Sequence, residues 1–199
     1  MKQDHGETGE AAGRGLSSGV RAELRALGLL EGKGAPAAHA PGLDPVEGRA
    51  GVVKRAISAP EVLNEAYDYG SSFTRGMRVE LPGATMLYLS GTASVDENGR
   101  TIHPGDFGAQ CLRTLRNLTH LLHAEGASWH DIVRTTCYIR DIERDYDEFN
   151  EIRTMFMTAI GLDPLPASTG IQARICRSDL LVEIEAIAII PAGNGPREG

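Results

Sequence analysis

The segment from Leu180 to Ile190 is apolar apart from Glu183 and Glu185, two carboxylates that could do acid–base chemistry. Residues two apart in a strand lie on the same face, so both glutamates would share a face otherwise made of leucine and isoleucine. Such a face is too apolar for plain solvent, and we expect a second subunit to cover it. Partial burial would raise the pKa of a glutamate and suit it to general acid–base catalysis. The alternative is a pair of solvated or salt-bridged sheet residues.

The cysteine and histidine spacing gives no sign of a metal site. The sequence has three cysteines, too few and too uneven for a disulfide framework, and it has no CxxC or HExxH motif. Cys111 and Cys137 fall on expected core faces. Cys176 precedes Arg177, whose charge could lower the pKa of the thiol, but a buried core position is the interpretation we favour.

Composition narrows the class of protein. The chain has 199 residues, of which 41% are hydrophobic and 24% charged, as in globular proteins. The net charge of −7 argues against nucleic acid or an anionic membrane as a partner. The sequence has no run of about 18 apolar residues that could span a bilayer. Residues 1–10 are polar and unlike a signal peptide, so we expect a cytoplasmic protein.

The first third of the chain differs from the rest. Residues 1–66 contain no aromatic side chain, and ten of the 24 glycines lie in the first 50 residues. We therefore predict a Gly/Pro-rich extension over 1–66, with a short helix at 18–31 where apolar residues recur at helical spacing. The folded domain is expected over 67–191, followed by a flexible tail over 192–199.

The periodicity of the remaining residues predicts a two-layer α+β domain with two helices on a mixed sheet. Asp106 is expected to cap the first helix, and Val133 is expected to face the core together with Cys137. A leading strand over 64–72 would give the order β-β-β-α-β-α-β-β. The expected strands are 77–81, 85–92, 131–141, 170–175 and 180–190, and the expected helices are 106–124 and 144–160.

Several short motifs together resemble the Rid family, also called YjgF, over residues 70–191. They are Leu87 to Thr92, the helix with Gln110 and Asn117, Asp131 to Val133, Phe149-Asn150, Pro166-Ala167 and Val182 to Ile187. This resemblance implies a chorismate-mutase-like fold and a homotrimer with sites in clefts between subunits. It also implies cofactor-free hydrolysis of enamines and imines, such as 2-aminoacrylate, to a keto acid and ammonia.

The resemblance assigns roles to individual residues. Glu183 matches the catalytic glutamate of the family. Ser90 and Gly91 match the serine and glycine of the site wall. Phe73 stands where the family usually has a tyrosine, so the hydroxyl group is missing.

The largest departure follows Pro166-Ala167. Deaminating members have an arginine there that clamps the substrate carboxylate in a bidentate fork, whereas this chain has Ser168. Gly170 replaces the usual cysteine, although the backbone N–H groups near Thr169 and Gly170 could still bind a carboxylate. Arg75 is our first candidate for the missing cation, because it would share a face with Phe73. The alternative for Arg75 is a surface or intersubunit salt bridge.

A second resemblance concerns chorismatases, which are Rid-related hydrolases that split chorismate into a dihydroxycyclohexadiene acid and pyruvate. Residues 90–94, 103–106 and 175–184 are similar to the C-terminal half of these enzymes, which use a glutamate at the position of Glu183. Chorismatases carry a second Rid-like half for which this chain lacks the length, so we expect a single-domain relative.

Two classes of function therefore remain open. The first is a trimeric hydrolase or deaminase acting on a small carboxylated enamine, imine or enol ether, with Glu183 handling the proton. The second is a non-catalytic trimer that binds a small metabolite or a partner protein. Loss of the family arginine favours the second class, and retention of Glu183 in an apolar strand favours the first. Substrate contacts are expected from Phe73, Arg75, Ser90, Gly91, Ser168, Thr169, Gly170 and Cys176.

Overall fold

The computed structural model describes residues 16–29, 52–64 and 72–192. The chain forms two compact units, Met1–Ala50 and Gly51–Gly199. In the first unit, helix α1 (Ser18–Ala26) begins at Ser17, whose hydroxyl oxygen accepts a hydrogen bond from the Val20 N–H at 3.2 Å. The helix is shorter than the one predicted over 18–31, because Gly28 adopts a left-handed backbone conformation with φ of 70°. Residues 30 and 31 lie outside the described residues.

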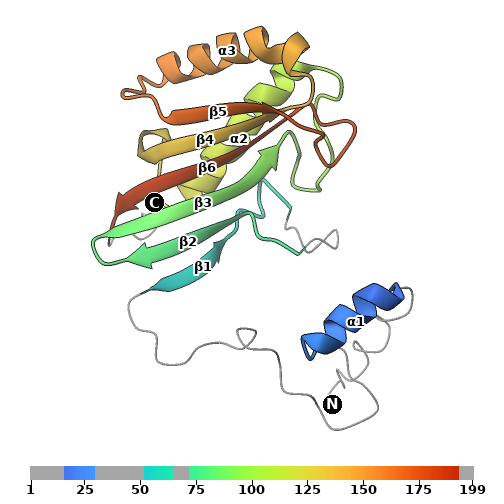
Figure 1. Ribbon diagram of the computed structural model, residues 1–199. Helices are drawn as coiled ribbons and strands as arrows, with labels where there is room; N and C mark the ends of the chain where they lie inside the picture. The colour runs from blue at the N-terminus through green and yellow to red at the C-terminus, as the bar shows by residue number, and fades with distance from the viewer. Residues whose placement is uncertain (1–15, 30–51, 65–71, 193–199) are drawn as a thin grey trace, which may run out of the picture. The chain divides into compact units, whose positions relative to one another are not determined.

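The second unit contains one six-stranded mixed sheet. Its strands follow the order β1-β2-β3-β6-β4-β5, with β1 at one edge and β5 at the other (Figure 1). Among the described strands, the pair β4–β5 is parallel and the other neighbours are antiparallel. The strands are β1 (Val53–Ile57), β2 (Gly76–Leu81), β3 (Ala84–Ala93), β4 (Ile132–Ile139), β5 (Ala167–Gln172) and β6 (Val182–Pro191).

Two long helices complete the α+β fold. Helix α2 (Phe107–Ala124) packs against β3 and β6, and α3 (Ile142–Ala159) packs against α2 and β4. The Asp106 carboxylate caps α2 by accepting a hydrogen bond from the Ala109 N–H at 2.9 Å, as the sequence predicted. A short 3-10 helix, η2 (Trp129–Asp131), leads into β4. None of the described helices is long and apolar enough to cross a bilayer.

Strand β6 has the two unlike faces that its sequence predicted. Val182, Ile184 and the alternate residues after them are buried in the core. Glu183 and Glu185 lie on the opposite face and are only partly buried. The core side of β6 is thus fixed by apolar packing, which leaves both carboxylates on the face that the helices do not cover.

The sheet begins earlier than the expected boundary at residue 66. Strand β1 pairs antiparallel with β2, and its Arg55 forms an ion pair with the buried Glu125 at 2.6 Å. Only Ile57 of β1 is buried, so the strand lacks the apolar alternation that marks a half-buried strand. The leading strand predicted over 64–72 falls mostly outside the described residues.

Two further predictions about strands were wrong. Strand β5 begins at Ala167 rather than at residue 170, and all six of its residues are exposed, so burial leaves no pattern in its sequence. Val133 is exposed rather than in the core, because a register shift between Ile132 and Arg134 turns its side chain away.

Candidate active site

Five of the nine predicted site residues line one pocket of about 660 Å³. Phe73 and Arg75 lie just before β2, Gly91 is on β3, Glu183 is on β6, and Cys176 lies between β5 and β6. The antiparallel pairing of β3 with β6 sets Ala93 opposite Glu183 and brings these segments together. Residues more than 100 positions apart in the sequence therefore share one wall.

The carboxylate of Glu183 lies directly over Gly91. A Cβ atom on Gly91 would be 1.9 Å from Oε1 of Glu183, so only glycine leaves room for this position of the carboxylate. Burial raises the pKa of Glu183, and the charge of the neighbouring Glu185 raises it further, whereas Arg75 acts in the opposite direction. Glu183 thus has the environment of a general acid that keeps its proton at higher pH than an exposed glutamate.

Replacing Gly91 by alanine is expected to displace the Glu183 carboxylate without unfolding the domain, because the clashing atom ends a flexible side chain. A displacement of about 1 Å can cost about 100-fold in rate, so we expect a loss of that order in kcat/KM for any reaction that uses Glu183. Circular dichroism and steady-state kinetics would test this. Gly19→Ala, in α1, is the control, because its Cβ would meet nothing closer than 3.9 Å.

Arg75 is buried and held in place by Asn64. Its Nε atom donates to the Asn64 backbone oxygen at 2.7 Å, and its Nη2 atom donates to Oδ1 of the same residue at 2.9 Å. The guanidinium carbon lies 5.7 Å from the centroid of the Phe73 ring. The expected face shared by Phe73 and Arg75 is therefore present, with the cation fixed beside the pocket.

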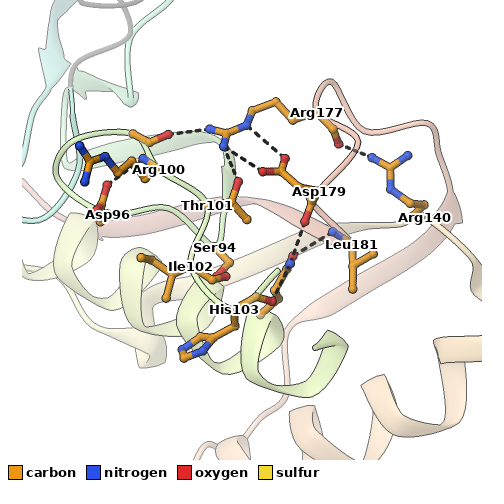
Figure 2. A network of polar contacts seen from close by, with 12 residues as sticks. Ser94, Asp96, Arg100, Thr101, Ile102, His103, Arg140, Arg177, Asp179 and Leu181 are labelled. Carbon is orange, nitrogen blue, oxygen red and sulfur yellow. Dashed lines mark hydrogen bonds and ion pairs between the residues drawn. The ribbon is translucent and has the colours of Figure 1, made fainter. Parts of the chain in front are cut away.

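Polar contacts join the two loops at the mouth of the pocket (Figure 2). Nη1 of Arg177 donates to the Gly99 carbonyl at 2.6 Å, and Nη2 contacts the Thr101 hydroxyl. The same guanidinium forms an ion pair with Asp179 at 3.3 Å. Cys176 is exposed beside this contact, so the expectation of a buried core cysteine was wrong for this residue.

Gln110 of α2 connects the same two loops through hydrogen bonds. Its side chain is fully buried, and its Nε2 atom donates to the carbonyls of His103 at 3.0 Å and Asp179 at 2.9 Å. Its Oε1 atom accepts from the Leu181 N–H at 2.9 Å. A rigid helix thereby fixes the segment that leads into Glu183.

The other four predicted site residues do not line this pocket within one chain. The Ser90 hydroxyl donates to the Thr74 carbonyl at 2.7 Å, and Ser90 lines a separate hollow that contains Glu185. Ser168, Thr169 and Gly170 lie on β5, at the edge of the sheet.

Sequence reasoning did not assign Asn64, Gly99 or Arg177 to the site. Arg177 lies in the chorismatase-like stretch, but that resemblance did not indicate that its loop borders a pocket. Asn64 had no local signal, because its role depends on a contact with Arg75 that only the folded chain creates.

Comparison with known proteins places this geometry in a family. The family model "Endoribonuclease L-PSP" matches residues 72–190. A mouse 2-iminobutanoate/2-iminopropanoate deaminase is 32% identical over 104 residues, which are 52% of this chain and 73% of that protein. The 3-aminoacrylate deaminase RutC of Acinetobacter baylyi is 29% identical over 103 residues, which are 52% of this chain and 78% of that protein.

Solved structures of two E. coli proteins resemble the fold of this chain. The crystal structure of E. coli TdcF with bound serine matches with a TM-score of 0.57 and 26% identity, over 68% of this chain and 98% of that one. The E. coli YjgF gene product matches with a TM-score of 0.56 and the same 26% identity, again over 68% and 98%. The match to the family model over residues 72–190, together with these relatives, shows that the chain belongs to the endoribonuclease L-PSP family, which is the Rid (YjgF) family that its motifs resemble.

Proposed function

We propose that this protein is a cofactor-free deaminase that hydrolyses a small carboxylated enamine or imine. The observation that carries the proposal is Glu183, a carboxyl group with a raised pKa that lies over Gly91 in a pocket of about 660 Å³. The relatives that are named as imine and aminoacrylate deaminases support the same reaction class.

The proposed reaction begins with the acid form of Glu183, which donates its proton to the terminal carbon of the enamine double bond. The π electrons form the new C–H bond, and the nitrogen lone pair forms a C=N bond, giving an iminium ion. Water then adds to the iminium carbon while the Glu183 carboxylate accepts its proton. The hydroxyl proton of this adduct passes to nitrogen, ammonia leaves, and the C=O bond of the keto acid forms.

Arg75 is proposed to stabilise the negative charge of the Glu183 carboxylate during this reaction. Its guanidinium faces the same pocket and lowers the pKa of Glu183, so it stabilises the carboxylate formed after proton donation. Asn64 holds the guanidinium in position through two hydrogen bonds.

We further propose a homotrimer with its sites between subunits. Ser168, Thr169 and Gly170 lie apart from the Glu183 pocket in one chain, and a second copy would bring them to it. The exposed outer edge of β5 and the uncovered face of β6 are the surfaces available for this contact. Light scattering tests the assembly, and a monomer in solution would contradict an intersubunit site.

The reaction is tested by ammonia release from enzymatically generated 2-aminoacrylate and from the imines of larger amino acids. We expect release faster than the spontaneous rate measured without the protein. Release at the spontaneous rate for every substrate would contradict the proposal, and the small-metabolite-binding function would then stand in its place.

A chorismatase-like hydrolysis of an enol ether is the second candidate. It is favoured because the chorismatase-like stretch over 175–184 supplies Cys176, Arg177, Leu180 and Glu183 to the pocket. The same acid would protonate the enol-ether carbon, and water would add to the resulting cation and return a proton to the Glu183 carboxylate. The hemiketal would then break its C–O bond to the ring, which releases the ring alcohol and forms the C=O bond of pyruvate. Release of pyruvate from chorismate, in the same set of assays, would favour this candidate over deamination.

A further inference from the structure

Arg153 of α3 extends to Ser168 of β5, the position at which the family resemblance implies an arginine. Its Nη1 atom donates to the Ser168 hydroxyl at 3.1 Å, and its Nη2 atom donates to Oδ1 of Asn150 at 2.6 Å. The guanidinium carbon lies 5.1 Å from the centroid of the buried Phe149 ring. Three contacts from α3 and β5 therefore hold a guanidinium beside residue 168, although that residue is a serine.

Arg153 forms no ion pair with the described part of the chain. Both of its acceptors are neutral, and none of the ion pairs among the described residues includes it. By contrast, Arg177 at the mouth of the Glu183 pocket is paired with Asp179. A guanidinium has five N–H donors, so Arg153 retains donors for a further acceptor. A fixed, unpaired and partly buried cation favours an anionic ligand.

A small hollow lies beside this guanidinium. It has a volume of about 190 Å³ and is lined by Arg153, Met157, Leu165, Pro166 and Ser168, among others. Liquid water would place about six molecules in that volume, so it suits the carboxylate end of a small keto or imino acid. Thr135 also donates to the Ser168 hydroxyl, at 3.0 Å, which holds this lining side chain in place.

We propose that Arg153 binds the substrate carboxylate, and that each site combines Arg153 of one copy with Glu183 of another. This inference rests on the proposed deaminase and names its carboxylate-binding residue. Arg153 and Glu183 line different hollows of one chain, so they serve one substrate only across a contact between copies.

The first test is the binding of 2-oxobutanoate, a product-like keto acid, measured by calorimetry. Removing a charged hydrogen-bonding partner with Arg153→Ala should weaken binding about 10- to 100-fold. Adding Ser168→Arg to that variant should restore most of the affinity, which a merely structural role of Arg153 would not predict. The neutral 2-oxobutanamide should bind the wild type and Arg153→Ala equally. Arg116→Ala, an exposed arginine of α2, is the matched control and should bind as the wild type does.

The second test asks whether two copies share a site. Arg153→Ala and Glu183→Gln chains are co-expressed, and ammonia release by the mixed oligomers is compared with that of each variant alone. Random assortment would give about a quarter of the interfaces an intact Arg153 and Glu183 pair, so part of the activity should return. A double variant carrying both changes in each chain should stay inactive.

The outcomes separate this inference from the proposed function. Binding of 2-oxobutanoate through Arg153 without turnover of any imine would refute the deaminase and leave the carboxylate site standing. If the wild type turns over an imine but Arg153→Ala binds 2-oxobutanoate as tightly as the wild type does, the inference is overturned. The same holds if the binding of 2-oxobutanoate is lost in Arg75→Met and not in Arg153→Ala. Failure of the wild type to bind 2-oxobutanoate would overturn it as well.

Discussion

Glu183→Gln is expected to lower kcat for enamine or imine hydrolysis by about 100- to 10,000-fold, the usual contribution of a general acid–base group. Glutamine has nearly the same shape as glutamate but cannot release a proton to carbon or accept one from water. Since the pKa of Glu183 is raised by burial, removing its charge should not destabilise the domain. The measurement is ammonia release under saturating substrate.

The control for this variant is Glu61→Gln, which removes the same charge from an exposed position. It should keep wild-type turnover. Binding of 2-oxobutanoate should also survive in Glu183→Gln, because the proposed carboxylate contact lies with Arg153. A Glu183→Gln protein that retains turnover within tenfold of the wild type would show that another group moves the proton.

Gln110→Leu is expected to reduce the free energy of unfolding by about 2–4 kcal/mol, because each buried backbone group left without a partner costs about 1–3 kcal/mol. Leucine has a similar size but cannot accept from the Leu181 N–H or donate to the Asp179 carbonyl. The His103 carbonyl keeps a second donor, the Asp106 N–H at 3.2 Å. The segment leading into Glu183 should therefore loosen, and kcat should fall together with stability.

Urea denaturation at a fixed protein concentration measures this change, since oligomer stability depends on concentration. Arg116→Ala on the same helix is the control, because this side chain is exposed. A Gln110→Leu protein as stable as the wild type would show that water or a rearranged loop satisfies the two backbone groups.

The parts of the fold that were predictable are those with a strong local signal. The alternation along β6 and the Asp106 cap of α2 depend on residues within one segment, so the sequence alone identifies them. Strands β1 and β5 lie at the edges of the sheet and bury almost nothing. Their sequences are therefore not constrained to alternate, so β1 was not predicted, and β5 was predicted with the wrong bounds.

The residues of the candidate site also differ in whether a local sequence signal could reveal them. Glu183 stood out as a carboxylate in an apolar strand, and the structure gives it a raised pKa for the expected reason, burial. Gln110 and Arg177 act through contacts with residues about 70 to 80 positions away, which no local pattern records. Arg153 is an ordinary helix residue by its sequence, and its significance depends on the neighbouring Ser168.

We expect Glu183 to work in its protonated form, and the pH dependence of kcat/KM shows whether it does. The rate should fall as the pH rises through the raised pKa of Glu183, because the acid form is then lost. Removing the neighbouring negative charge with Glu185→Gln lowers the pKa of Glu183, so this fall should move to lower pH. In Glu183→Gln the fall should be absent from the residual rate. A fall that stays at the same pH in Glu185→Gln and persists in Glu183→Gln would contradict the account.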